Sequence, residues 1–284
     1  MWILYISRGK QMKTNLSTQT SQMLSKVPEV TIIFWIIKVM GTTVGETAAD
    51  FLSVNLHLGL SGTSFIMGAL LLVSLFIQIR YKKYVPWIYW ITVVLISILG
   101  TLITDDLVDN FGVSLQITTV LFSLALLVTF IAWYASEKTL SIHSIYTSKR
   151  ELFYWAAILC TFALGTASGD LAAEGWHWGY ARSAVVFASL IGVVTMAHYL
   201  LKLNAILSFW IAYILTRPLG ASCGDLLTQP IGNGGFGLDT SVISISCLLT
   251  ILGLVVYLTI SQKKILAGQE LAFAAYEQKD DEER

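Results

Sequence analysis

The chain has 284 residues, of which 55% are hydrophobic and 13% charged, with a mean hydropathy of +0.70 and a formal net charge of zero. Soluble domains carry about 25% charged residues, so this composition supplies too little polar surface for a water-facing protein of this size. It excludes a soluble enzyme and a disordered protein. The neutral balance, without a long basic stretch, also excludes a nucleic-acid partner.

Eight stretches are long and apolar enough to cross the roughly 30 Å hydrocarbon core of a bilayer as helices. They cover residues 30–52, 61–79, 86–109, 114–136, 152–174, 183–201, 206–227 and 239–262. Because these apolar runs are continuous and much longer than the strands of a membrane barrel, they predict an all-α integral membrane protein surrounded by lipid.

The basic residues predict the orientation of these spans. Fifteen of the 18 Lys and Arg residues lie in the N-terminal segment, in the second, fourth and sixth loops, and in the tail. These segments all lie on one side of the membrane, and Lys and Arg are enriched in cytoplasmic loops. We therefore expect both termini to be cytoplasmic.

The odd-numbered stretches share a pattern in which an aromatic pair containing Trp precedes a glycine and then acidic residues. The Trp residues are Trp35, Trp90, Trp155 and Trp210, and the leading glycines are Gly41, Gly100, Gly165 and Gly220. The Trp stands ten residues before the leading glycine in the last three copies but six before it in the first, which predicts a drifted or differently tilted first helix. The pattern predicts four two-helix repeats, over residues 30–85, 86–150, 151–204 and 205–262, between an N-terminal segment (1–29) and a tail (263–284).

Each repeat contributes one motif helix and one plain helix. Because every repeat has two spans, all four motif helices run in the same direction, and we expect them at the centre of the bundle in pseudo-fourfold or two-plus-two order. Small residues four apart let membrane helices pack closely. The candidate packing residues are Gly41, Gly45, Gly100, Gly165, Gly169, Gly220 and Gly224.

Acidic residues follow each leading glycine at two fixed distances. Five residues on stand Glu46, Asp105, Asp170 and Asp225, and nine residues on stand Asp50, Asp109 and Glu174. Charged groups inside a membrane are costly and mark functional sites, and hard divalent cations favour oxygen ligands. The first set is therefore a candidate metal site and the second set a further tier of ion ligands. As alternatives, the acids carry protons, or they lie among headgroups and were merely copied with the repeat.

Two basic residues, Lys38 and Arg217, stand three residues before the leading glycines of the first and fourth copies. Each is expected to pair with a carboxylate on a neighbouring motif helix, either as a gating salt bridge or as a static packing contact. If both pointed into one pocket, an anionic or zwitterionic substrate would be favoured over a metal.

On these repeats the chain resembles bacterial membrane-anchored proteins built from four copies of domain of unknown function 347, in which each copy has two spans and a Trp. The resemblance covers residues 30–262 and implies a fold and a location in the cytoplasmic (inner) membrane. It implies no activity.

The leading hypothesis is a transporter or channel-like protein for a small cation, either a divalent metal or a proton-coupled cation. We expect no resident cofactor, and a metal ion only as the substrate. The alternatives are a sensor, stress-response or scaffold protein without transport and a membrane-embedded carboxylate or metal enzyme. The residues give no nucleophile–base arrangement for the enzyme, and they predict no oligomeric state.

Overall fold

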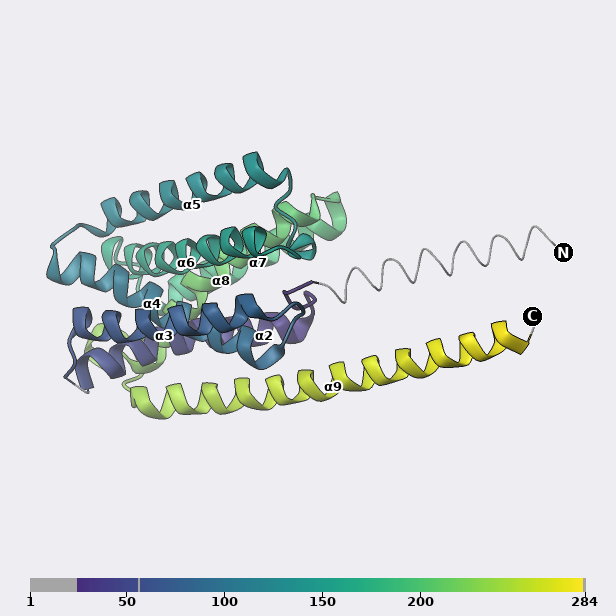
Figure 1. Cartoon of the computed structure of the whole chain (residues 1–284). Coiled ribbons are helices and arrows are strands. Elements are labelled where there is room, and N and C mark those ends of the chain that lie inside the picture. Colours follow the sequence, from purple (N-terminus) through teal and green to yellow (C-terminus); the bar gives the residue numbers. More distant parts are fainter. Residues whose placement is uncertain (1–24, 56, 283–284) are drawn as a thin grey trace.

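The computed structural model describes residues 25–55 and 57–282, so the expectations for residues 1–24 and for the last two residues lie outside the described chain. Within it, eight helices are long and apolar enough to cross a membrane, and there are no strands (Figure 1). These helices are α2 (Ile32–Asp50), α3 (Leu60–Arg80), α4 (Pro86–Asp105), α5 (Leu115–Glu137), α6 (Ser148–Asp170), α7 (Tyr180–Leu201), α8 (Ala205–Thr228) and α9 (Thr240–Glu282). The predicted all-α membrane fold is confirmed.

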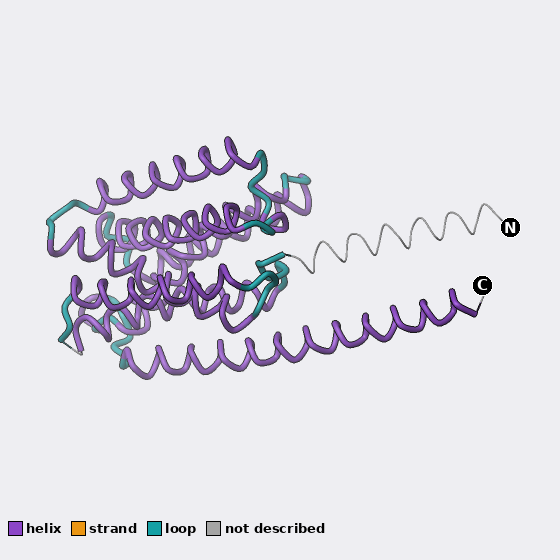
Figure 2. Tube along the Cα trace, viewed as in Figure 1, coloured by secondary structure: helices purple, strands orange, loops and turns teal. Residues whose placement is uncertain are grey.

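Local sequence explains where several helices begin. Thr31, Ser114, Thr147 and Asn204 precede α2, α5, α6 and α8, and the side chain of each accepts a hydrogen bond from a backbone N–H of the first turn. Such caps satisfy donors that a helix leaves unpaired at its start. Pro86 opens α4, where its missing N–H is not needed. The connecting loops gather at the two ends of the bundle (Figure 2).

The motif helices form a closed ring at the centre of the bundle. Helix α2 packs on α4, α4 on α6, α6 on α8, and α8 returns to α2. Between 56% and 72% of the apolar 18-residue stretch of each motif helix is buried, against 6% to 17% for the plain helices. The motif helices are therefore central and the plain helices peripheral, in pseudo-fourfold order.

Each plain helix packs mainly on the motif helix of the next repeat rather than on its own. Helix α3 lies on α4, α5 on α6, and α7 on α8, while α9 closes the cycle by lying on α2. The hydroxyls of Thr47 in α2 and Ser244 in α9 meet at 2.6 Å across this closing contact. Beyond its span, α9 extends past the bundle at the end where α2 begins (Figure 1).

The glycine contacts show the register of the ring. A Cβ on the leading glycine of one copy would strike the residue three places before the leading glycine of the next copy. The pairs are Gly45 with Ser97, Gly100 with Phe162, Gly165 with Arg217, and Gly220 with Thr42. Such close approach needs glycine because any side chain would separate the helices.

This register corrects the expectation for the first copy. Its leading glycine is Gly45, which follows Trp35 by ten residues as in the other copies, and not Gly41, whose Cβ would meet no atom within 4 Å. Gly41 and Gly45 are one helical turn apart, and each is followed after five residues by an acid, so the glycine–acid spacing alone fitted both. The first helix is not drifted, and Gly41 is not at a close helix contact.

Candidate ion-binding site

The corrected register rearranges the candidate acids into layers along the axis of the ring. The aspartates five residues after the leading glycines are Asp50, Asp105, Asp170 and Asp225, one from each motif helix. Glu46 lies one helical turn deeper, at the level of Thr101, Thr166 and Ala221. Lys38 corresponds to Tyr213, and Arg217 corresponds to Thr42, so the two basic residues occupy different layers.

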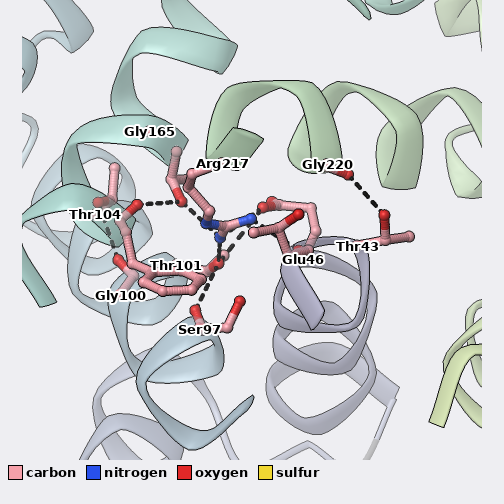
Figure 3. Close-up of polar contacts among 12 residues, drawn as sticks. Thr43, Glu46, Ser97, Gly100, Thr101, Thr104, Gly165, Arg217 and Gly220 are labelled. Atoms are coloured by element: carbon pink, nitrogen blue, oxygen red, sulfur yellow. Dashed lines mark hydrogen bonds and ion pairs between the residues drawn. The ribbon is translucent and has the colours of Figure 1, made fainter. Parts of the chain in front are cut away.

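Arg217 lies at the centre of the ring and contacts all three other motif helices (Figure 3). Its Nη1 donates to the Thr42 carbonyl at 2.9 Å, and its Nη2 lies 3.1 Å from Glu46 Oε2 and 2.8 Å from Thr166 Oγ1. Nη2 also contacts the Thr101 hydroxyl, which donates to Glu46 at 3.4 Å. The guanidinium is fully buried, so the predicted ion pair to a neighbouring motif helix is present as Arg217–Glu46.

Three carboxylates, including that of Glu46, converge at the acidic end of this pair. Glu46, Asp170 and Asp225 each place an oxygen within 4.8 Å of the other two. They come from α2, α6 and α8, and Glu46 and Asp225 are each 6% exposed. Hard cations such as Mg²⁺, Mn²⁺ or Ca²⁺ take oxygen ligands of this kind, so these residues could hold one.

The other predicted acids surround this trio without joining it. Asp50 and Asp105 are partly buried, and Asp105 is not within the same 4.8 Å group among the described residues. Asp109 and Glu174 are exposed, and Glu174 accepts a hydrogen bond of 2.8 Å from the Tyr180 hydroxyl. The acids therefore grade from a buried inner group to an exposed outer pair.

The helix geometry changes directly after the equivalent aspartates. In the first three copies a single π-helical turn follows at once, over Phe51–Asn55, Asp106–Asn110 and Leu171–Gly175. The fourth helix instead continues to Thr228 without such a turn in the described residues. π-turns are uncommon and occur often at functional sites, and the sequence pattern gave no signal for them.

Threonine hydroxyls tie the ring together at the level of the site. Thr43 Oγ1 donates to the Gly220 carbonyl at 3.2 Å, and Thr104 Oγ1 donates to the Ala163 carbonyl at 3.0 Å. Both bonds join neighbouring motif helices. The Ser222 hydroxyl is also buried, but it has no hydrogen-bond partner among the described residues.

Lys38 corrects a second expectation, because its ammonium pairs with no carboxylate among the described residues. Its Nζ lies 3.7 Å from the centroid of the Phe162 ring and 4.2 Å from that of Tyr213. Lys38 precedes Glu46 by eight residues, which is about two helical turns. The Lys38 side chain therefore lies below the acids, in a layer of aromatic rings. Contact with ring faces stabilises a buried cation there.

Aromatic side chains fill the N-terminal half of the ring. The Tyr89 and Tyr154 hydroxyls meet at 2.5 Å, and Phe34, Trp90 and Tyr213 pack around them with at most 2% exposure. Below this layer, a buried ion pair of 2.6 Å joins Lys26 to Glu151, which also accepts from Gln78. The sequence pattern does not predict this pair, because Lys26 lies in the N-terminal segment, outside the apolar stretches.

Comparison with known proteins supports the four-repeat organisation. A family model described as Repeat of Unknown Function (DUF347) matches residues 33–84, 88–139, 153–204 and 208–264. Each match begins two residues before the Trp and twelve before Gly45, Gly100, Gly165 or Gly220, which agrees with the register of the glycine contacts. No curated protein and no solved structure matches the chain.

Proposed function

From the premise that this multi-pass membrane protein belongs to the Repeat of Unknown Function (DUF347) family, we propose that it transports a small cation, a divalent metal ion or a cation coupled to protons. The family description supplies no activity, so the proposal depends on the site. The single observation that carries it is the convergence of Glu46, Asp170 and Asp225 beside a buried arginine.

The graded acids give a cation a path from the outside of the bundle to its centre. Asp109 and Glu174 are exposed at the C-terminal ends of their helices and attract cations electrostatically. The aspartate layer follows, and Glu46 is the deepest ligand. A cation that loses part of its water shell in this layer gains carboxylate oxygens in its place.

Arg217 acts in this proposal as a tethered cation that competes with the transported one. Its guanidinium already occupies the layer beyond the acids, where it is held by Glu46 and by hydroxyls of α4 and α6. A bound cation that draws Glu46 away leaves Arg217 without its counter-charge. Because an unpaired buried charge costs several kcal/mol, about 3–5 in soluble proteins, binding would favour a rearrangement of α8.

The filled core below the site favours a carrier over an open channel. Phe162 lies beside Arg217, and below them the buried side chains of Tyr89 and Tyr154 meet between neighbouring motif helices. Passage would then require the motif helices to move relative to one another. Pro218, inside α8 next to Arg217, removes a backbone hydrogen bond at the place where such bending would occur.

We further propose that the protein lies in a bacterial cytoplasmic membrane with both termini in the cytoplasm. In the described chain, the loops at the N-terminal ends of the motif helices and the first turn of α6 carry Lys82, Lys83, Lys138, Lys149, Arg150 and Lys202. In this orientation the acids would face the outside, where the substrate would enter.

Uptake into proteoliposomes tests the proposal. Vesicles holding a metal-sensitive or pH-sensitive dye would be exposed to Mn²⁺, Mg²⁺ or a proton gradient. We expect Asp170→Asn and Asp225→Asn to lower the rate at least about tenfold, the loss typical of disturbed metal ligation. Asp239→Asn is the matched control, because Asp239 is an exposed acid of the same outer side outside the cluster.

If Asp170→Asn and Asp225→Asn both transported the cation at the wild-type rate, the proposed transport site would be refuted. If the same variants altered only thermal stability, the acids would serve packing, as the scaffold hypothesis expects.

A further inference from the structure

A groove opens on the side of the bundle, at the end opposite the acids. It encloses about 490 Å³ between the first turns of α2 and α8, the second half of α7 and the loop before α6. Trp35, Phe209 and Ile191 are among its mostly apolar lining residues. This volume lies in the range of sites for small organic ligands, about 300–1,000 Å³.

The groove is reached from the lipid side of the protein. Helix α7, which forms one wall, has only 6% of its apolar stretch buried, and Tyr199 at its end is 77% exposed. In a membrane this wall is surrounded by acyl chains. The apolar lining of the groove is therefore suited to contact with acyl chains.

Ser208 and His198 each offer a polar group to a ligand in the groove. Ser208 is 7% exposed, and its hydroxyl has no hydrogen-bond partner in the described chain. His198 Nδ1 lies 2.9 Å from the Leu203 carbonyl. Because a carbonyl only accepts, Nδ1 carries the proton, and Nε2 is left for a second partner.

The segments that adjoin the lining residues in the chain carry exposed basic side chains. No lining residue is acidic, and the exposed Lys138 and Lys202 lie within three residues of lining positions. Glu29 is one residue from the lining, and Glu137 is already paired with Arg150 at 2.8 Å. Basic pockets between membrane helices bind anionic lipid headgroups.

We propose that this groove is a binding site for an anionic glycerophospholipid. One acyl chain occupies the apolar part, the Ser208 hydroxyl donates to an ester carbonyl, and the phosphate lies toward His143 and Lys202. The inference is independent of transport, because none of these residues belongs to the acidic site.

Native mass spectrometry of the full chain in detergent tests the site with phosphatidylglycerol and phosphatidylcholine as probes. We expect phosphatidylglycerol to bind more tightly and Lys202→Gln to weaken it about fivefold, since one basic residue near an anionic headgroup contributes about 1 kcal/mol. Ser208→Ala should weaken both lipids. The controls are Lys264→Gln and Ser189→Ala, at exposed positions outside the groove.

A phosphatidylglycerol with a photoreactive acyl chain locates the binding position. Cross-links to residues 191–212 support the inference. Three results would each overturn it. The two lipids could bind equally, with no change in Lys202→Gln; the cross-links could be confined to other helices; or a quinone could be recovered in place of the phospholipid.

Discussion

Replacing Gly45 by alanine tests the register of the ring directly. The new Cβ would lie 2.7 Å from Ser97 Cβ and 3.0 Å from the Ser97 carbonyl carbon, in addition to striking the Ser97 hydroxyl. A rotamer change of Ser97 can move only the hydroxyl, so α2 and α4 must separate. Overpacking of this kind costs about 1–3 kcal/mol, against which alanine gains roughly 0.5–1 kcal/mol in helix propensity.

Gly41→Ala is the matched control, one turn earlier on the same helix. Its Cβ meets no atom within 4 Å, so only the propensity gain remains. We therefore expect Gly45→Ala to destabilise the protein by about 1–2 kcal/mol and Gly41→Ala to stabilise it slightly. Unfolding in SDS–detergent mixtures, followed by far-UV circular dichroism, measures both. Equal destabilisation by the two variants would refute the corrected register.

Two further predictions concern charges at the site and at an exposed loop. Arg217→Met should destabilise the protein by about 3–5 kcal/mol in the same unfolding assay, because it leaves Glu46 buried without its partner. Adding Glu46→Met should recover most of this loss. If the effects of the two substitutions on the free energy of unfolding were simply additive, the specific pair would be contradicted. Hydrogen bonds from the Ser241 hydroxyl and the Val242 amide lower the pKa of Asp239 at the start of α9. Because this pKa is lowered, the ionised Asp239 cap stabilises the helix at pH values above the ordinary pKa of aspartate. This stabilisation is lost as the pH falls through the lowered pKa. Protection of the Val242 amide from hydrogen exchange should fall over that range, and Asp239→Asn should remove the pH dependence.

The sequence was sufficient for the repeats and for the division into central and peripheral helices. The combined pattern of Trp, glycine and acid at fixed spacing recurs only in the motif helices, and lipid-facing helices need no such pattern. The partner of each plain helix was not predictable, because their apolar surfaces carry no feature that distinguishes one motif helix from the next. Nothing in α9 indicates that it closes on α2.

The site was predictable in composition but not in its layers. Glu46 and Asp50 both follow a glycine by five residues, and the choice of Gly41 placed Lys38 and Arg217 in one layer. The Trp35–Gly45 spacing was the signal for the alternative. With it, Lys38 falls among the rings of Phe162 and Tyr213, where no carboxylate lies within ion-pair distance in the described chain. The π-turns had no signal, since their sequences differ among the copies.

The closure of α9 on α2 bears on how the protein is made. Of the eight membrane-spanning helices in the described residues, α2 is the first to leave the ribosome, with Lys38 and Glu46 in its apolar stretch. Arg217 lies 171 residues after Glu46, and α9 follows it. During synthesis, Glu46 therefore lacks its ion-pair partner, and Lys38 lacks its contact with Tyr213, until α8 has been inserted. A chain that ends before α9 would leave one side of α2 uncovered, so quality control should recognise it there first.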